Sequence, residues 1–450
     1  MKAWYKKFIE RYFRSDKKNL ASANYFVHIP KTAGTSFIVL LDRFYPADKI
    51  YPHQLWREAK DIDLTQNQKY DLYRGHFGGG GVGVLTDRHI DFFTILRDPV
   101  ALANSTFQFV KRETNTKVHQ LVEQQDMSFS QFLSHPMTSP LVQNRMVRNI
   151  SFDFVEDPAA QEVFLSAETI EYLQSIIQGQ GLEITDEQRL ERAKKFIQQC
   201  RWFGLLERFD ESLQLLCFEM YWPPIGQTQK LNTFKQSSEL TVKERRLIDQ
   251  LNQYDNLLYD HSVELFEDRI ENMRYQLKKF QTYQSQTIDH LLDIRYQKHH
   301  AKVVSEELPD ALSFGFDQVL FGSQWHRREL MQPENEYFRW TGPGAQASID
   351  CWVQPLDYQL SIRIINATSI ELLEQLNISI NGHSVEWKTG DSGLVRILTV
   401  DCPVDLIKNN GLVRVVFTCH DMLRHADVFN SDDERLVGVA VHWLKFSHES

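Results

Sequence analysis

The sequence predicts an α/β domain with a central parallel sheet, then a helical connector and a C-terminal all-β sandwich. In the first part, short apolar runs at residues 25–29, 92–96 and 202–206 alternate with helical patterns. Such alternation is typical of a parallel sheet covered by helices. From about residue 312, β-rich runs are separated by turn residues. We expect an N-terminal segment 1–23, an α/β domain 24–264, a connector 265–311 and a sandwich 312–450.

The N-terminal segment is basic and aromatic and lacks the apolar core of a signal peptide. It could lie on an anionic membrane surface. The preferred alternative is that it packs on the first domain with its lysines in water, because charged helices are usually solvated on one face. No apolar run approaches the ~20 residues of a membrane-spanning helix. We expect a cytoplasmic protein, peripheral at the inner face of the membrane under the first alternative.

The net charge and the cysteines argue against two classes of protein, namely general nucleic-acid binders and zinc proteins. The net charge of −10 argues against a general nucleic-acid binder, so an anionic ligand would need a local site. None of the five cysteines forms a Cys-x-x-Cys pair, so no zinc site is expected. An odd, sparse set of cysteines suits a reducing cytosol.

Residues 25–36 form the most informative stretch. An apolar strand candidate is followed by a small polar turn, and apolar residues at helical spacing begin at Phe37. Strand, tight loop and helix together make an anion cradle. Lys31 adds a charge, and hydroxyl groups that can donate to phosphate are carried by Thr32, Thr35 and Ser36. The loop is not a Walker A loop, because its Lys precedes the single Gly34.

A second anion site is predicted where the run 92–96 ends. Asp98 is a good helix N-cap and Pro99 suits the first helical position, so Arg97 lies at a strand–helix junction. Ser105 follows about two turns into this helix. Both Arg97 and Ser105 can face the carboxyl edge of the sheet, where ligands bind in open α/β folds. The two loops together can bracket a nucleotide with phosphates at both ends.

The stretches His28-Ile-Pro-Lys-Thr-Ala-Gly-Thr-Ser36 and Leu96-Arg-Asp-Pro-Val100, with Ser105, resemble the Golgi-type carbohydrate sulfotransferases. The similar group is that of heparan sulfate 2-O-sulfotransferase and its bacterial relatives, over about residues 24–268. The resemblance implies a P-loop-like three-layer fold and 3′-phosphoadenosine 5′-phosphosulfate (PAPS) as co-substrate. It assigns the 3′-phosphate to Arg97 and Ser105, and the 5′-phosphosulfate to Lys31, Thr32, Ala33, Gly34, Thr35 and Ser36. The family often has a further Arg where this chain has Leu102.

Sulfuryl transfer to a hydroxyl needs a base, a cation for the leaving phosphate and in-line positioning. Lys31 suits the leaving oxygen, and no metal is required. For the base we expect His76, since histidine titrates near neutrality and the resemblance places a Gly-His base between the two loops. The alternative is that the glycine-rich residues 75–83 are only a flexible turn with His76 on its surface.

Acceptor contacts are predicted from a polar cluster that could meet an acidic sugar. A solvated helix face would explain the helical members of this cluster equally well. Its members are Arg74, Gln143, Asn144, Arg145 and Arg148. Lys230 and Lys235 are candidates for a loop that closes over the nucleotide.

Residues 265–303 are predicted as one long polar helix with an apolar seam, formed by Phe266, Ile270, Met273, Leu277 and Phe280. A connector docked on its own chain is the preferred interpretation. A homodimer contact and a helix lying on the first domain are the alternatives.

The C-terminal part has strand candidates at residues 347–353, 358–365, 376–380, 394–399, 412–417 and 437–444. Asn381-Gly382 and Asn410-Gly411 are hairpin signals. Residues 338–343 and 432–440 resemble β-sandwich modules appended to bacterial glycosyltransferases. The sandwich could bind glycan, with Trp325, Trp340, Trp352 or Trp387 as stacking platforms, or make a dimer contact. For any single tryptophan, a place in the core is preferred.

The expected function is transfer of a sulfuryl group from PAPS to a carbohydrate hydroxyl, in a bacterial polysaccharide or glycolipid precursor. Two alternatives remain open. One is a phosphotransferase of the P-loop kinase type, against which the missing Walker A loop argues. The other is a glycan-binding or scaffold protein whose nucleotide-binding domain has lost activity.

Overall fold

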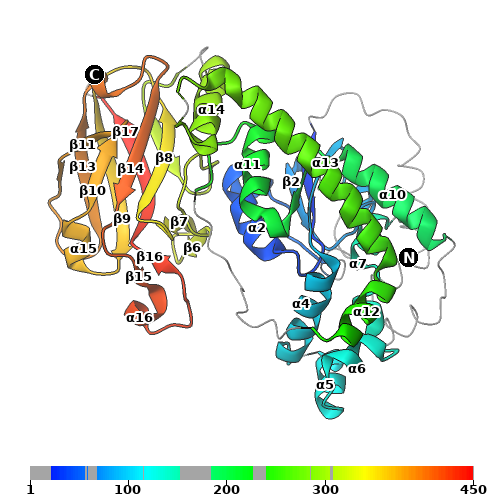
Figure 1. The fold of residues 1–450 in the computed structure, drawn as a ribbon. Helices are drawn as coiled ribbons and strands as arrows, with labels where there is room; N and C mark the ends of the chain where they lie inside the picture. Colours follow the sequence, from blue (N-terminus) through cyan, green and yellow to red (C-terminus); the bar gives the residue numbers. More distant parts are fainter. Residues whose placement is uncertain are drawn as a thin grey trace. The chain divides into compact units, whose positions relative to one another are not determined.

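The computed structural model describes residues 22–55, 58, 68–114, 116–152, 184–226, 240–283, 285–304 and 308–448 (Figure 1). Most of the predicted N-terminal segment 1–23, and Lys230 and Lys235, lie outside the described residues. The chain divides into two compact units. The first spans Met1–Gly34, Lys49–Ser212 and Asn232–Asn272, and the second spans Thr35–Asp48, Leu213–Leu231 and Met273–Ser450, within the limits of the described residues.

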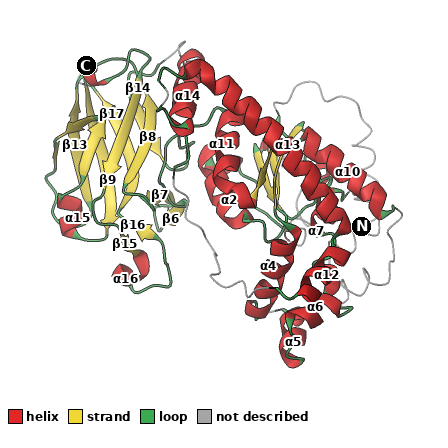
Figure 2. Ribbon diagram, viewed as in Figure 1, coloured by secondary structure: helices red, strands yellow, loops and turns green. Residues whose placement is uncertain are grey.

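The first unit contains the predicted parallel sheet. Its strands are β1 (Ala23–Val27), β2 (Leu72–Gly75), β3 (Ile90–Leu96) and β4 (Trp202–Leu205), in the order β2-β1-β3-β4. Figure 2 draws the strands in yellow and the helices in red. All three pairings are parallel. The three strands predicted from the sequence are confirmed, and β2 was not predicted. Because the chain leaves β1 for one neighbour and then crosses to the other, the carboxyl ends of β1 and β3 form a switch point.

Helices of the first unit are α4 (Pro99–Arg112), α5 (Lys117–Gln124), α6 (Phe129–Ser134), α7 (Arg145–Ile150), α10 (Asp186–Gln199) and α12 (Val242–Leu251). Asp98 caps α4 as predicted, since its carboxylate accepts from the Ala101 N–H at 2.8 Å and Pro99 occupies the first turn. One apolar cluster joins α4, α5, α6 and α12 through Phe107, Val122, Phe132 and Ile248. This packing fixes α4, which starts at the end of β3.

The predicted single connector helix is wrong. The structure has α13 (Gln253–Leu277), a 3-10 turn (Lys278–Phe280) and a separate helix α14 (Ile288–Val304). The seam residues of α13 are buried, namely Phe266, Ile270, Met273 and Leu277. The seam is therefore covered within this chain, which agrees with a connector docked on its own chain, and a homodimer stays a prediction.

The second unit also takes in α2 (Gly34–Leu41) from Thr35 onward, the 3-10 turn Asp42–Phe44, and most of α11 (Phe209–Met220). Hydrogen bonds tie residues 43–47 to residues 317–328 of the same unit. They are Leu320 N–H to Arg43 O at 2.7 Å, Ala47 N–H to Asp317 O at 2.8 Å, and Arg328 Nη2 to Tyr45 O at 3.0 Å. An early segment of the chain thus folds together with the C-terminal part.

Two antiparallel sheets form most of the second unit. One has the order β11-β10-β14-β8, with β8 (Gln346–Trp352), β10 (Asn377–Ile380), β11 (His383–Val385) and β14 (Leu412–Thr418). The other has the order β12-β13-β9-β17-β7-β6, and β5 also pairs with β17. Its strands are β5 (Leu312–Gly315), β6 (Glu329–Met331), β7 (Glu336–Trp340), β9 (Tyr358–Ala367), β12 (Trp387–Lys388), β13 (Arg396–Cys402) and β17 (Val439–Ser447).

The two sheets share one apolar core. Ile349 and Val415 enter it from the first sheet, and Ile362, Leu398 and Leu444 enter from the second. Because two antiparallel sheets pack on a common core, the predicted β-sandwich is confirmed. Beside it, β15 (Leu423–Arg424) and β16 (Leu436–Val437) form a small ribbon, with α16 (His425–Phe429) between them and α15 (Ile370–Glu374) after β9.

The two Asn-Gly pairs behave differently. Asn381-Gly382 joins β10 to β11 as a two-residue hairpin, with positive φ at both residues and Ile380 paired with His383. Asn410-Gly411 precedes β14, whose partners are β8 and β10, so the second pair is a turn but not the predicted hairpin. The strand before it, β13, belongs to the other sheet.

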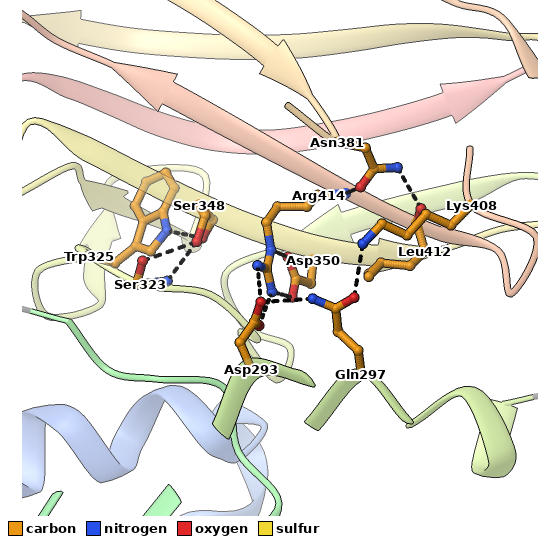
Figure 3. A network of polar contacts seen from close by, with 10 residues as sticks. All are labelled: Asp293, Gln297, Ser323, Trp325, Ser348, Asp350, Asn381, Lys408, Leu412 and Arg414. Carbon is orange, nitrogen blue, oxygen red and sulfur yellow. Dashed lines mark hydrogen bonds and ion pairs between the residues drawn. The ribbon is translucent and has the colours of Figure 1, made fainter. Parts of the chain in front are cut away.

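Helix α14 is held on the sandwich by the polar network in Figure 3. Arg414 of β14 donates from Nε and Nη2 to Asp350 of β8, both at 2.7 Å. The same guanidinium donates from Nη1 and Nη2 to Asp293 of α14, at 2.9 and 2.7 Å. Lys408 Nζ donates to Gln297 of α14 at 2.9 Å. One arginine therefore bonds both to Asp350 on the neighbouring strand and to Asp293 on the helix, and the second contact joins α14 to the sheet.

The four tryptophans that were candidates for stacking on a sugar are buried or partly buried in the second unit. Trp325 and Trp340 are buried, so their ring faces are not available for a sugar. Trp325 donates from Nε1 to Ser348 O at 2.7 Å, and Trp387 donates from Nε1 to Leu376 O at 2.9 Å. Trp352 and Trp387 are partly buried.

Candidate functional site

The candidate site lies at the carboxyl edge of the parallel sheet. His76 follows β2, Lys31 follows β1, Arg97 follows β3 and Glu207 follows β4. With the strand order β2-β1-β3-β4, these residues succeed one another along a single edge. Three of the four were predicted from the sequence, and Glu207 had no assigned role. The edge brings together the two anion loops and the candidate base.

The loop after β1 is held in a fixed shape. Lys31 and Ala33 have positive φ, of 72° and 64°, on either side of Thr32. Such alternation turns successive backbone N–H groups toward one concave side, where an anion can bind. The buried Thr32 donates from Oγ1 to Ile29 O at 2.9 Å, and Arg97 donates from Nη1 to Lys31 O at 2.8 Å. Thr32 can therefore reach an anion only through its backbone N–H, since its single hydroxyl proton is used.

Gly34 closes the loop and begins α2, and its lack of a side chain is required by His28. A Cβ at Gly34 would lie 1.9 Å from Cδ2 and Nε2 of the His28 ring. His28 is 9% exposed, and its Nδ1 has no hydrogen-bond partner among the described residues. Thr35 is exposed and Ser36 is partly buried in the first turn of α2, and their contacts to phosphate stay predictions.

The tautomer of neutral His76 is set by its neighbour. His76 Nδ1 lies 2.7 Å from the backbone oxygen of His28. A carbonyl oxygen only accepts, so Nδ1 carries the proton and Nε2 keeps its lone pair. The two imidazole rings stack with centroids 4.2 Å apart. Burial, with a smaller contribution from Arg145, lowers the pKa of His76 to about 4, and the bond to His28 opposes this shift. The imidazole is therefore a neutral acceptor near pH 7.

The glycine-rich segment after His76 is packed and hydrogen-bonded. The N–H groups of Gly79 and Gly80 donate to Asn149 O and Phe152 O at 2.9 and 2.7 Å. His76 N–H donates to Gln54 O at 2.8 Å, and a Cβ at Gly75, whose φ is 148°, would lie 2.4 Å from that same oxygen. These contacts favour a fixed His76 over the flexible-turn alternative.

Positive charge is concentrated around Lys31. Burial, and after it the charges of Arg112, Arg145 and Arg97, lower the pKa of Lys31 to about 8, while Glu113 opposes this shift. Lys31 Nζ also lies 4.3 Å from the centroid of the Phe109 ring. These cations repel one another, and a bound polyanion would reduce that repulsion and stabilise all of them.

Arg97 lies between the loop and the end of β4. Burial lowers its pKa, which Glu207 and Asp98 oppose, and its buried Nε has no partner among the residues that the structure describes. Glu207 accepts from Asp98 N–H at 3.0 Å and from the Tyr259 hydroxyl at 2.7 Å. Ser105 is partly buried on α4. This arrangement keeps Arg97 Nη1 on the loop and leaves Nε for another acceptor.

Position 102, where the resembling family often has an Arg, faces the core. Leu102 is buried in the first unit. A cation instead approaches α4 from α7, because Arg145 donates from Nη1 to Thr106 Oγ1 at 3.1 Å, one residue from Ser105. Arg145 also lowers the pKa values of His28, His76 and Lys31. Of the predicted acceptor residues, Arg145 is thus the one whose charge acts on the candidate base His76.

The other predicted acceptor residues have structural contacts. Asn144 accepts from the N–H groups of Tyr254 and Asp255 at 3.1 and 3.3 Å, at the start of α13. Asp255 in turn accepts from the N–H groups of Met146 and Val147 at 2.9 and 2.8 Å, at the start of α7. Arg74 donates to Tyr51 O at 3.0 Å and Arg148 donates to Pro140 O at 3.1 Å, while Gln143 is partly buried. The Asn144 amide oxygen is therefore occupied by a reciprocal helix cap.

Several residues of this region had no role predicted from the sequence. They are Arg112, Glu207, Asp255, Tyr259 and His28, which was named only as the first residue of the motif 28–36. Glu207, Asp255 and Tyr259 fall within residues 24–268, over which the chain resembles the sulfotransferases, but outside the two anion loops. Their partners lie far away in sequence, so no local pattern pointed to them.

Across the described ranges, no group of three or more His, Cys, Asp or Glu side chains is arranged to hold a metal ion. None of the described helices combines the length and apolar character needed to cross a bilayer. No protein-family model matches the chain, and no curated protein sequence matches it either.

Proposed function

We propose that this chain is a PAPS-dependent carbohydrate O-sulfotransferase. The observation that carries the proposal is the pairing of a neutral, tautomer-fixed His76 with the cationic Lys31 loop along one sheet edge. A base that accepts a hydroxyl proton and a cation that meets a leaving phosphate are the two groups that sulfuryl transfer asks of a protein. Acceptors in keeping with the resemblance are polysaccharide or glycolipid precursors.

The donor set suits a nucleotide with anionic groups at both ends. Lys31 and the backbone N–H groups of Thr32, Ala33 and Gly34 would hold the 5′-phosphosulfate, with Thr35 and Ser36 at the helix start. Arg97, whose buried Nε is unpaired among the described residues, and Ser105 would hold the 3′-phosphate. When bound, PAPS supplies the sulfuryl group that becomes the sulfate ester.

The chain's own groups divide the remaining work. His76 Nε2 would accept the proton of the sugar hydroxyl, while the Nδ1–H bond to His28 O holds the ring in place. The Lys31 ammonium would stabilise charge on the leaving oxygen. A protonated His76 is disfavoured by burial and by Arg145, so its proton would return to water before the next cycle. The charge of Arg145 acts on both His76 and Lys31, and this arginine would bind an anionic part of the reactants.

Equilibrium binding of 3′-phosphoadenosine 5′-phosphate and of ATP tests the proposal. We expect the bisphosphate to bind at least about tenfold more tightly than ATP, because Arg97 and Ser105 would bind its 3′-phosphate, which ATP lacks. Tight binding of ATP alone would favour the phosphotransferase alternative. A screen with PAPS and a range of sugar acceptors should then give sulfated product. Bisphosphate binding without turnover on any acceptor would favour the inactive glycan-binding alternative.

A further inference from the structure

Two arginines of the second unit are buried with the same edge unpaired. Arg43, in the turn Asp42–Phe44, is 4% exposed, and Arg339, in β7, is 0% exposed. In both side chains, Nε and Nη2 are buried and have no hydrogen-bond partner within the described part of the chain. Arg339 uses only its other terminal nitrogen, Nη1, which donates to His326 O at 2.6 Å.

Nε and Nη2 together form the edge of a guanidinium that binds an oxyanion through two parallel hydrogen bonds. The same unit shows how this edge is normally satisfied. Arg414 places Nε and Nη2 on Asp350, and Arg435 places them on Asp433 at 2.8 and 2.6 Å. Leaving such charged donors buried and unpaired is costly. Arg43 and Arg339 therefore lack the oxyanion partner that a carboxylate provides for Arg414 and Arg435.

Hydrogen bonds bring the segments of the two arginines to one region. Arg43 O accepts from Leu320 N–H at 2.7 Å, and His326 N–H donates to Trp340 O at 3.0 Å, next to Arg339. Residues 320–328 therefore connect the turn that carries Arg43 to the strand that carries Arg339. Both arginines belong to the second unit.

The charge around the two side chains is in positive excess. Burial lowers the pKa of Arg339 well below its usual value, and Arg328 and Arg43 lower it further. Asp42 and Glu329 oppose this effect, but Glu329 already lies 2.7 Å from Arg435 Nη1. An added anion would reduce the repulsion among the arginines.

We propose that Arg43 and Arg339 bind a small oxyanion of the sulfate or phosphate type through their Nε–Nη2 edges. The anion would be enclosed, because both side chains are buried, and it would act as a structural ligand of the second unit. None of the residues involved belongs to the candidate nucleotide site, so this inference is independent of the proposed function.

Refolding in the presence and absence of the anion tests this inference. The full chain is unfolded in guanidinium chloride and refolded in chloride, with or without about 5 mM sulfate or phosphate at matched ionic strength. We expect at least one oxyanion to raise the Tm by about 3 °C or more. The low concentration limits the general stabilisation that these salts cause by exclusion from protein surfaces.

Matched variants locate the effect. Arg339→Lys and Arg43→Lys keep the charge but lose the two-pronged edge, so each should lose most of the response. Arg327→Lys, at an exposed neighbouring position, should keep it. Lys31→Ala should also keep it, which separates this site from the nucleotide loop. An equal Tm in chloride and oxyanion for the unsubstituted chain would overturn the proposal, as would a full response in Arg339→Lys. If that variant does not fold, Arg43→Lys decides by the same criterion.

Discussion

The ammonium group of Lys31 titrates close to physiological pH because its surroundings lower its pKa. Its ammonium form is disfavoured by burial and by three arginines, which lower its pKa to about 8. Below this pH the free protein presents a cation to the nucleotide. As the pH rises through about 8 the amine becomes neutral and the attraction for a phosphate is lost.

Affinity for 3′-phosphoadenosine 5′-phosphate should therefore change little between about pH 7 and 8 and fall above it, since the phosphates themselves take up protons only near about pH 6. Among the neighbouring charges, that of Arg112 lowers the pKa of Lys31 most. Arg112→Gln removes this charge, so the affinity should begin to fall at a higher pH. Isothermal titration calorimetry between pH 6.5 and 9.5 measures both profiles, with Lys111→Gln as the exposed neighbouring control. An affinity independent of pH over this range would contradict the assigned role of Lys31.

His76 is fixed in one orientation by a bond that any side chain with a similarly placed N–H could make. His76→Ala removes the base and the bond, and His76→Asn keeps a donor for His28 O but provides no base. Both substitutions should lower kcat by about 10²–10⁴-fold. The Kd for the bisphosphate should change by less than about threefold, because this nucleotide relies on Lys31, Arg97 and the loop.

Steady-state kinetics with PAPS and binding of the bisphosphate give the two readouts for His76. Activity should also be lost only as the pH falls toward about 4, since the imidazole must be neutral to accept a proton. A variant without an imidazole that retained more than about a tenth of kcat would show that another group is the base.

Among the structural elements, α14 is tied to the sandwich by the Arg414 ion pairs, and the rings of Tyr296 and His300 also contact Trp352 of β8. Arg414→Gln would leave the carboxylates of Asp350 and Asp293 close together, with the Asp350 side chain 0% exposed. We expect a loss of about 3–5 kcal/mol in the free energy of unfolding. Lys408→Gln, which removes only an exposed bond to Gln297, should cost less than about 0.5 kcal/mol. Urea unfolding compares the two, and similar midpoints would show that the Arg414 clamp contributes little.

The elements that sequence patterns predicted are those whose signals are local. The strands before Pro30 and Arg97, the Asp98 cap and the Asn381-Gly382 hairpin each depend on neighbouring residues, and the structure contains them. Strand β2 is only Leu72–Gly75 and shows no alternation, so its sequence carried no strand signal. The end of α13 was missed because the residues after it lack Gly and Pro.

Contacts between distant residues set the rest of the site, and no local pattern encodes them. Asn144 and Asp255 cap each other's helices across more than a hundred residues, so the amide oxygen of Asn144 also has a structural partner. Arg97 bonding to Lys31 O is likewise a product of strand order. The residue types of the site could be predicted, but their division between binding and support could not.

At the scale of the whole molecule, the compact units are not continuous in sequence. The predicted boundaries at 264 and 311 are single cuts, whereas residues 35–48 and 213–226 group with the C-terminal sandwich. Phe44 of the early segment stacks on Trp222 with centroids 3.7 Å apart and lies 6.4 Å from the Phe321 ring. The helix that follows the Lys31 loop therefore leads into a unit completed by the last third of the chain.

A chain cut after residue 311 should consequently fail to fold as an independent protein. The cut removes the partners of Arg43 O, Tyr45 O and the Ala47 N–H, and it uncovers the apolar surface around Phe44. We expect residues 1–311 to aggregate or to unfold without a cooperative transition, measured by size-exclusion chromatography and circular dichroism. Loss of activity in this fragment would then reflect loss of folding as well as any loss of glycan capture.

A proteolytic site inserted between Asp391 and Ser392, which are exposed in the sandwich, provides the control because cleavage there breaks the chain but leaves every strand in place. The cleaved protein should stay folded and keep its Tm within a few degrees. A monomeric, cooperatively folded fragment 1–311 with a similar Tm would show that residues 35–48 do not need the sandwich. Activity of that fragment on polymeric acceptors would then test glycan binding directly, because folding and acceptor capture would have been separated.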